Sequence, residues 1–126
     1  MVNFSGLTLT EGPPIYLQIT TYVKRGMVGG TICHGDELPS RRVLSVQLGV
    51  NPNTIQKAYR LLEENGLLTS HAGSKSYIQT TPQTIATLRQ ELLEAELSAM
   101  VSAVKAMGTT KEEALTLLSN LWEETL

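Results

Sequence analysis

Six polar side chains that cluster between positions 41 and 57 are the best candidates for chemistry in this sequence: Arg41, Arg42, Asn53, Thr54, Gln56 and Lys57. Asn and Gln side chains pair bidentately with adenine edges, Lys reaches guanine or phosphate, and a Thr methyl group can touch a thymine methyl. Arginine guanidinium groups suit phosphate oxygens. Residue types alone favour the simpler interpretation, in which these are ordinary solvent-facing residues of short helices. The arrangement of these residues must therefore decide between the two interpretations.

A metal site is the second chemistry to consider, because Cys33, His34, Asp36 and His71 are all metal-ligand types. Cys33 and His34 are adjacent, so their side chains diverge. No second cysteine and no close pair of histidines completes a tetrahedral ligand set. We expect a packing cysteine and exposed histidines, and no metal site.

Catalytic motifs are missing from the sequence. It contains no glycine-rich phosphate loop, no nucleophile elbow and no paired catalytic carboxylates. The pairs Glu63-Glu64 and Glu123-Glu124 are typical of solvated helix faces. The sequence predicts that the protein is not an enzyme and binds no cofactor.

Two short helices with their own start signals position the polar cluster. Ser40 is a suitable N-cap for a helix over 41–48, and Gly49 makes the turn that follows. Asn51 then caps a second helix, with Pro52 at its first position, and Asn65-Gly66 ends it. The residues expected to face inward are Val43, Leu44 and Leu48 on the first helix, and Ile55, Tyr59, Leu61 and Leu62 on the second.

This pattern predicts a helix-turn-helix, which presents the front of its second helix to a groove. The groove that accepts an α-helix in this way is most often the major groove of B-form DNA. The capped helices and the glycine turn therefore favour DNA contact for the polar cluster.

A β-hairpin is predicted after the helices, from strand-like runs at 67–70 and 76–79 around a turn over 72–75. In this context the hairpin would be a wing. Gly73 lies at its tip, flanked by His71 and Lys75. Lys75 could touch phosphate or lie along a minor groove, or the tip could be an ordinary solvated turn.

The amino-terminal part is expected to begin with a flexible lead over residues 1–12. Pro13-Pro14 sets up a helix with apolar residues at helical spacing, and Gly29-Gly30 ends that helix. Residues 31–33 are expected to form a short edge strand. Together with the helix-turn-helix and the wing, these elements make a predicted domain over residues 13–80.

Residues 83–126 are predicted to form an α-hairpin. A long helix over 83–107 is broken by Gly108, and the sequence from Thr110 to Glu113 is a capping box for the last helix. The hairpin is too apolar to stand alone in water. A dimer interface is the preferred interpretation, with a ligand pocket as the alternative. The residues assigned to dimerisation are Leu88, Leu92, Ala95, Ala99, Leu118, Leu121 and Trp122.

Charge and composition permit this interpretation. The chain of 126 residues carries a net charge of −2, but residues 1–80 hold seven basic and five acidic residues, whereas 81–126 hold three basic and seven acidic ones. No apolar run approaches the roughly 18 residues needed to cross a bilayer. The amino terminus shows no export signal, and the single cysteine fits a reducing compartment. We expect a cytoplasmic protein without membrane contact.

With these residues in place, the chain resembles the GntR family of regulators, and within it the YtrA-like subfamily. The resemblance lies in residues 14–19 (Pro-Ile-Tyr-Leu-Gln-Ile), 35–40 (Gly-Asp-Glu-Leu-Pro-Ser), 51–54 (Asn-Pro-Asn-Thr), 58–59 and 62–63. It implies a winged helix-turn-helix homodimer that represses transcription from a pseudo-palindromic operator. By position, Arg42 matches the family's arginine, the second helix matches the recognition helix, and Gly73 falls on the wing. The wing here lacks the family's basic pair and second glycine.

The predicted fold is therefore mainly α with a small β-wing (α+β): a winged helix-turn-helix followed by a C-terminal two-helix dimerisation tail. The predicted function is sequence-specific binding of double-stranded DNA by a transcriptional regulator. Residues 83–126 are too few for an enclosed pocket, so a small-molecule effector would have to bind between the tail helices, at the dimer interface, or not at all. The alternative is a protein-interaction module built on a winged-helix fold.

Overall fold

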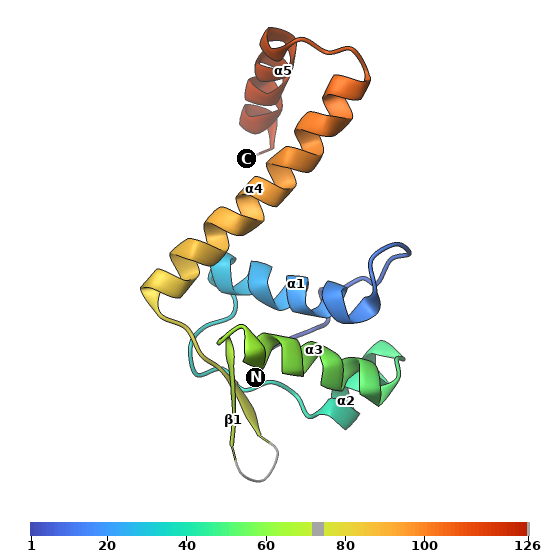
Figure 1. Cartoon of the computed structure of the whole chain (residues 1–126), viewed down its shortest axis with the longest axis vertical. Coiled ribbons are helices and arrows are strands. Elements are labelled where there is room, and N and C mark those ends of the chain that lie inside the picture. Colours follow the sequence, from blue (N-terminus) through green and yellow to red (C-terminus); the bar gives the residue numbers. More distant parts are fainter. Residues whose placement is uncertain (72–74, 126) are drawn as a thin grey trace. The chain divides into compact units, whose positions relative to one another are not determined.

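The computed structural model describes residues 1–71 and 75–125 (Figure 1). Within this part the chain forms α1 (Ile15–Gly29), α2 (Arg41–Leu48), α3 (Pro52–Glu64), β1 (Leu68–Ser70), β2 (Ser76–Ile78), α4 (Pro82–Ala106) and α5 (Lys111–Glu124). The predicted fold class, mainly α with a two-stranded wing, is confirmed. The chain divides into two compact units, Met1–Arg89 and Gln90–Leu126, and each is described by itself.

The hydrophobic core of the first unit lies where α1 packs against α3, with α2 and β1 also contacting α3. Apolar residues at helical spacing supply the core from α1 and α3, because positions three and four apart share one helix face. The buried side chains of these two helices include Ile19, Val23, Met27, Ile55, Ala58, Tyr59 and Leu62.

The turn between α2 and α3 follows the predicted signals. The Ser40 hydroxyl accepts a hydrogen bond from the amide of Val43 at 3.2 Å, and the Asn51 side chain accepts one from the amide of Asn53 at 2.8 Å. Gly49 ends α2 with φ +68°, a conformation that costs a residue with a side chain about 1 kcal/mol or more. The helix-turn-helix is thus determined locally.

The inward face of α2 differs from the prediction at one position. The side chain of Val43, predicted to face inward, is 56 % exposed, and the buried residues of α2 are Leu44 and Ser45. The reason is geometric: Val43 and Leu44 are about 100° apart around a helix, and this short helix buries only one narrow side. Val43 and Val46 consequently share the outer side of α2.

The wing is antiparallel, with Leu68 opposite Ile78, Thr69 opposite Tyr77 and Ser70 opposite Ser76. Alternation along each strand buries Leu68, Ile78 and Ser76. The expected edge strand over 31–33 does not form: the amides of Thr31 and Ile32 instead donate to the Gly26 carbonyl in the turn that closes α1. The segment that pairs with β2 is the next one, through a bridge between Glu37 and Tyr77.

The amino-terminal segment packs against the domain through Val2, Phe4 and Thr10, which differs from the expected flexible lead over residues 1–12. Val2 and Phe4 are buried, and the Val2 amide donates to the Glu37 carbonyl at 2.7 Å. The Tyr22 hydroxyl donates to the carbonyl of Asn3 at 2.8 Å. The side-chain amide of Gln18 accepts a hydrogen bond from the Thr10 amide and donates one to the Thr10 carbonyl. The alternation of Val2 and Phe4 around a polar residue is typical of an extended segment with one buried face, and it lacks the helical spacing of the elements that follow.

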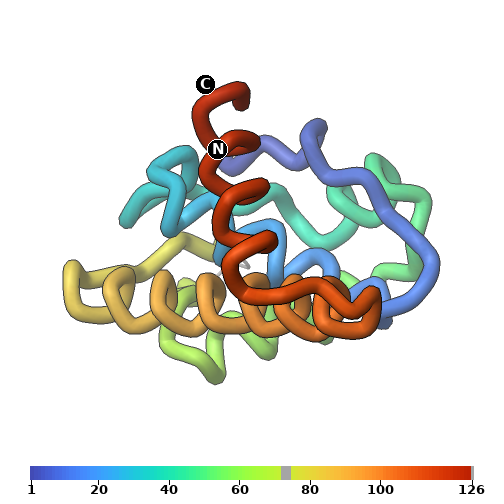
Figure 2. Tube along the Cα trace, turned by 90° about the horizontal axis from the view of Figure 1, so that it is seen from above, coloured from blue at the N-terminus to red at the C-terminus, as the bar shows by residue number. Residues whose placement is uncertain are grey.

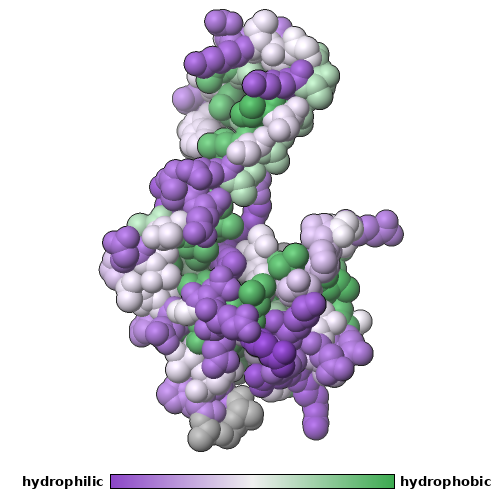
Figure 3. Space-filling model, in the orientation of Figure 1, coloured by the Kyte–Doolittle hydropathy of each residue, from purple (hydrophilic) through white to green (hydrophobic). Residues whose placement is uncertain are grey.

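The second unit contains most of α4 and all of α5. Helix α4 is continuous, and the chain turns at Gly108 into α5 (Figure 2). The Thr110 hydroxyl caps α5 by accepting from the amide of Glu113 at 3.2 Å. No residue of α5, all of which the structure describes, is buried. On the face in view, hydrophobic residues of these helices lie open on the surface (Figure 3).

None of the helices that the structure describes is both long enough and apolar enough to cross a membrane.

Candidate nucleic-acid interface

The amino-terminal ends of α2 and α3 carry the six polar residues singled out in the sequence. Arg42, Asn53 and Lys57 are exposed, whereas Arg41, Thr54 and Gln56 are half-buried. The caps at Ser40 and Asn51 fix where each helix begins, and the buried Ile55 and Tyr59 fix which side of α3 faces out. The exposed side of α3 therefore offers hydrogen-bond donors and acceptors on a rigid helix.

Tyr59 anchors α3 to the segment before α2. Its side chain is buried, and its hydroxyl donates to the Pro39 carbonyl at 2.7 Å. Burial raises the pKa of Tyr59 well above its ordinary value, and the nearby Arg41 charge offsets this only partly. The residue is therefore a neutral hydrogen-bond donor that ties α3 to the segment before α2.

Arg41 lies against the same tyrosine. Its guanidinium carbon is 5.6 Å from the centre of the Tyr59 ring, a distance at which a cation is attracted to the ring face. Its Nε atom is buried without a hydrogen-bond partner among the described residues. Arg41 is thus partly held by its own molecule, unlike the exposed Arg42.

Lys57 contacts a tyrosine of another helix. Its ammonium nitrogen lies 4.1 Å from the centre of the Tyr16 ring, which belongs to the first turn of α1. The sequence interpretation missed Tyr16 as a neighbour of the polar cluster. Nothing in the local pattern pairs residues so far apart in the chain, because the contact arises from the packing of α1 on α3.

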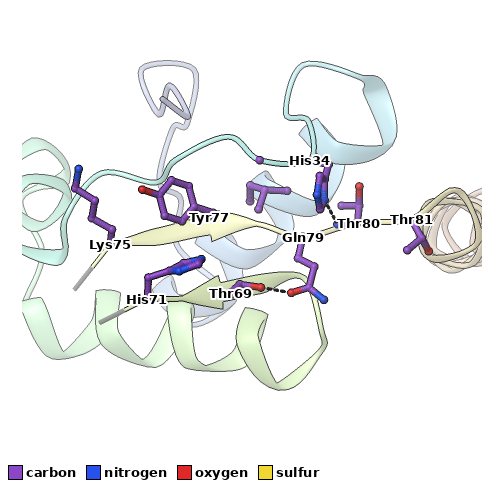
Figure 4. Close-up of a pocket in the computed structure, with 10 residues that line it drawn as sticks. His34, Thr69, His71, Lys75, Tyr77, Gln79, Thr80 and Thr81 are labelled. Carbon is purple, nitrogen blue, oxygen red and sulfur yellow. Dashed lines mark hydrogen bonds between the residues drawn. The ribbon is translucent and has the colours of Figure 1, made fainter. Parts of the chain in front are cut away.

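The outer face of the wing carries a further group of polar side chains (Figure 4). The rings of His71 and Tyr77 meet edge to face with centres 5.1 Å apart, and the amide of His71 donates to the Lys75 carbonyl at 2.8 Å. Lys75 is exposed beside them. Gly73, assigned to the wing tip from the sequence, lies outside the described residues.

These wing residues line a shallow hollow of about 700 Å³. At its other end, Nδ1 of His34 accepts a hydrogen bond from the Thr80 amide at 3.0 Å. The Thr69 hydroxyl donates to the side-chain oxygen of Gln79 (Figure 4). None of the described residues that line the hollow carries a carboxylate. Like the front of α3, this face is suited to an anionic surface.

The described residues bring no three His, Cys, Asp or Glu side chains together as metal ligands. Cys33, expected to be a half-buried packing residue, is instead exposed, because it lies in the turn after α1, where its amide donates to the Asp36 carboxylate at 2.8 Å. The Asp36 carboxylate thus stabilises the turn between Cys33 and Asp36.

The tail residues assigned to dimerisation differ in their exposure. Leu88 is buried, and it belongs to the first unit. Leu92 and Leu118 are half-buried, and Ala95 and Ala99 are exposed. Leu121 and Trp122 are 56 % and 70 % exposed. Open apolar surface is therefore concentrated on the second unit.

Sequence comparison identifies relatives of this chain. The family described as "Bacterial regulatory proteins, gntR family" matches residues 15–78. The transcriptional regulator YhcF of Bacillus subtilis is 36% identical over 102 residues, which cover 81% of this chain and 84% of that protein. The transcriptional repressor YtrA of the same organism is 39% identical over 71 residues, covering 56% of this chain and 55% of that protein.

Solved structures agree. A GntR family transcriptional regulator from Listeria monocytogenes has a TM-score of 0.78 and 31% identity, covering 89% of this chain and 98% of that one. The AraR DNA-binding domain, in complex with operator ORX1, has a TM-score of 0.50 and 30% identity, covering 56% of this chain and 92% of that one. These relatives are regulators of transcription, and the chain belongs to the GntR family of bacterial regulatory proteins, whose DNA-binding domain it carries.

Proposed function

We propose that this protein is a homodimeric repressor that binds a pseudo-palindromic operator through α3 of each copy. The observation that carries the proposal is the exposed front of α3, where Asn53 and Lys57 are exposed on a helix whose opposite side is fixed in the core, together with the exposed Arg42 in the first turn of α2. The similar AraR DNA-binding domain was solved in complex with an operator, which supports DNA binding by this domain.

The polar residues divide into two roles in this proposal. Asn53 and Gln56 contact base edges, because amide side chains form two hydrogen bonds with adenine, and the Thr54 methyl group contacts a thymine methyl. The cations Arg41, Arg42, Lys57 and Lys75 contact phosphate oxygens, which set register and supply most of the salt-dependent affinity.

Dimerisation through the second unit is supported by its uncovered apolar surface. None of the residues of α5 is buried, and Leu121 and Trp122 are both more than half exposed. Water contact on such side chains is unfavourable by about 25 cal/mol per Å². In the proposed dimer a second copy covers them and places two α3 helices about 34 Å apart, one turn of DNA.

Effector control is the finer part of the proposal. A small apolar molecule would fit a groove of about 490 Å³ between α4 and α5, with walls that include Val101, Val104, Leu115 and Leu118. This volume lies within the range of about 300–1,000 Å³ typical of ligand sites. The groove belongs to the same unit as the proposed dimer surface, so its occupancy would change subunit association.

The test begins with selection of bound fragments from a random pool of DNA. We expect an enriched sequence with two related half-sites, bound much more tightly than a random duplex, and a dimer by sedimentation. A protein that shows no shift even with a random duplex at low salt would instead be a protein-interaction module on this fold, since every DNA-binding protein of this kind has weak non-specific affinity.

A further inference from the structure

The contact between Lys57 and Tyr16 has a geometry that bears on DNA binding. The ammonium nitrogen lies 4.1 Å from the ring centre, well inside the roughly 6 Å within which a ring face attracts a cation. Among the described residues, Tyr16 is the partner that the structure records for this ammonium. The two residues come from different helices and have opposite exposures: Lys57 is exposed and Tyr16 is half-buried.

The core fixes the ring, and the ring then restricts the lysine. Tyr16 lies one turn before the buried Ile19 on α1, and Lys57 precedes the buried Ala58 on α3. The ring position is therefore set by the packing of α1 on α3. A free lysine samples many rotamers, whereas an exposed cation–π contact favours one arrangement by about two- to fivefold.

The contact also decides which side of α3 the ammonium occupies. An ammonium over the Tyr16 ring lies toward α1, at the flank of α3. A helix in the major groove directs its centre at the base edges and its flanks at the two phosphate backbones. The direction of Lys57 therefore fits a phosphate contact better than contact with guanine.

We propose that Tyr16 is a positioning residue, which holds the Lys57 ammonium at the flank of α3 for contact with a DNA phosphate. The proposal rests on the proposed function and deepens it. It assigns Lys57 a sequence-independent role and gives α1 a part in the interface.

A double-mutant cycle on a mixed-sequence duplex at about 50 mM salt tests the proposal, because a phosphate contact acts on every sequence. The variants are Lys57→Met, Tyr16→Leu, Tyr16→Phe and the Tyr16→Leu/Lys57→Met double variant. Lys105→Met in the second unit controls for the loss of one positive charge. Thermal unfolding of each variant identifies any general loss of structure.

We expect Lys57→Met to weaken binding by about tenfold and to lower the salt slope by about one unit. Tyr16→Leu should weaken binding by about two- to fivefold, the size of the contact. Tyr16→Phe, which keeps the ring, should restore most of that loss. In the Lys57→Met background Tyr16→Leu should change affinity by less than about twofold, and Lys105→Met should have no comparable effect.

The positioning role would be overturned if Tyr16→Leu weakened binding equally in both backgrounds, because Tyr16 would then act without Lys57. A Tyr16→Phe loss as large as that of Tyr16→Leu would overturn it too, since the hydroxyl would be the group that matters. An affinity of Tyr16→Leu equal to that of the unmodified protein would also overturn the positioning role. Failure of the proposed function gives a different result: the unmodified protein would not bind the duplex at all.

Discussion

The cations of the interface differ in how freely they move. Arg42 is exposed, Arg41 is stacked on the Tyr59 ring, and Lys57 lies over the Tyr16 ring. A long side chain loses rotamer entropy when it binds, and a side chain already restricted by its own molecule loses less. In the proposed interface, Tyr59 and Tyr16 would therefore prepare Arg41 and Lys57 for binding.

Arg42→Ala should weaken binding to every duplex by about 1–3 kcal/mol, the value of a charge-assisted hydrogen bond. It should also lower the slope of log K against log salt concentration by about 0.9 for each phosphate that the arginine neutralises. Gel shifts or fluorescence anisotropy at several salt concentrations measure both effects. Gln56→Ala is the matched variant: it should relax the preference at one base pair in each half-site and keep the salt slope. Equal losses on operator and random DNA for both variants would contradict the base-reading role of Gln56.

Tyr59→Phe should destabilise the fold by about 1–3 kcal/mol, because the buried Pro39 carbonyl loses its partner. Burial raises the pKa of Tyr59, so above pH about 10 the unfolded chain releases this proton before the folded chain does. The contribution of the hydroxyl is thus complete below that pH and is lost as the pH rises further. Urea unfolding of both proteins from pH 8 upward should show their stability difference narrowing above pH about 10. A constant difference would show that Tyr59 ionises equally in both states.

At the scale of elements, the angle between α2 and α3 depends on a single turn. Gly49 adopts φ +68° there, and its amide hydrogen bonds to the Ser45 carbonyl. Tyr59 and Leu44 then bury the inner sides of the two helices. The local turn and the shared core therefore favour the same angle between α2 and α3, and this consistency holds α3 rigidly in place.

Gly49→Ala should destabilise the protein by about 1 kcal/mol, because a side chain is strained at positive φ. Gly29→Ala is the matched control: it lies at the end of α1 with helical geometry, and an added Cβ would meet open space, as it would at Gly49. This control should be neutral or stabilising by up to about 1 kcal/mol. Denaturant unfolding compares the two. Equal effects would show that backbone conformation is not what requires glycine at position 49.

The helix boundaries could be predicted from sequence because caps are local. Ser40, Asn51 and Thr110 each accept a hydrogen bond from an amide two or three residues ahead, as their residue types indicate. The edge strand expected near Cys33 does not form, because strand pairing needs a partner from elsewhere in the chain. Residues 36–38 provide that pairing to β2 instead.

At the scale of the whole molecule, the two units have different surfaces. The first unit encloses an apolar core and presents cations and amides, whereas the second leaves most of its apolar side chains exposed. A contiguous apolar surface on a small domain marks an interaction site more often than chance exposure. Dimerisation through the second unit would separate the binding of DNA from the association of subunits.

Leu121→Glu should convert the proposed dimer to a monomer, because a carboxylate buried in an apolar interface is strongly unfavourable. Leu121 is 56 % exposed within one chain, so the fold of the monomer should persist. Asn120→Glu adds the same charge about 100° away around α5 and should leave the dimer intact. Sedimentation and circular dichroism measure association and helicity. A Leu121→Glu protein that stays dimeric would place the interface elsewhere.

The sequence by itself determined the elements and the kind of surface they carry. Caps, glycine turns and apolar spacing act over a few residues, so they specified the helix-turn-helix, the wing and the apolar tail. Only the tertiary structure decided that Val2 and Phe4 complete the core, that Val43 faces outward, and that Tyr16 lies beneath Lys57. These outcomes depend on which surfaces meet when the elements pack together, and such contacts join positions far apart in the chain, where no local pattern records them.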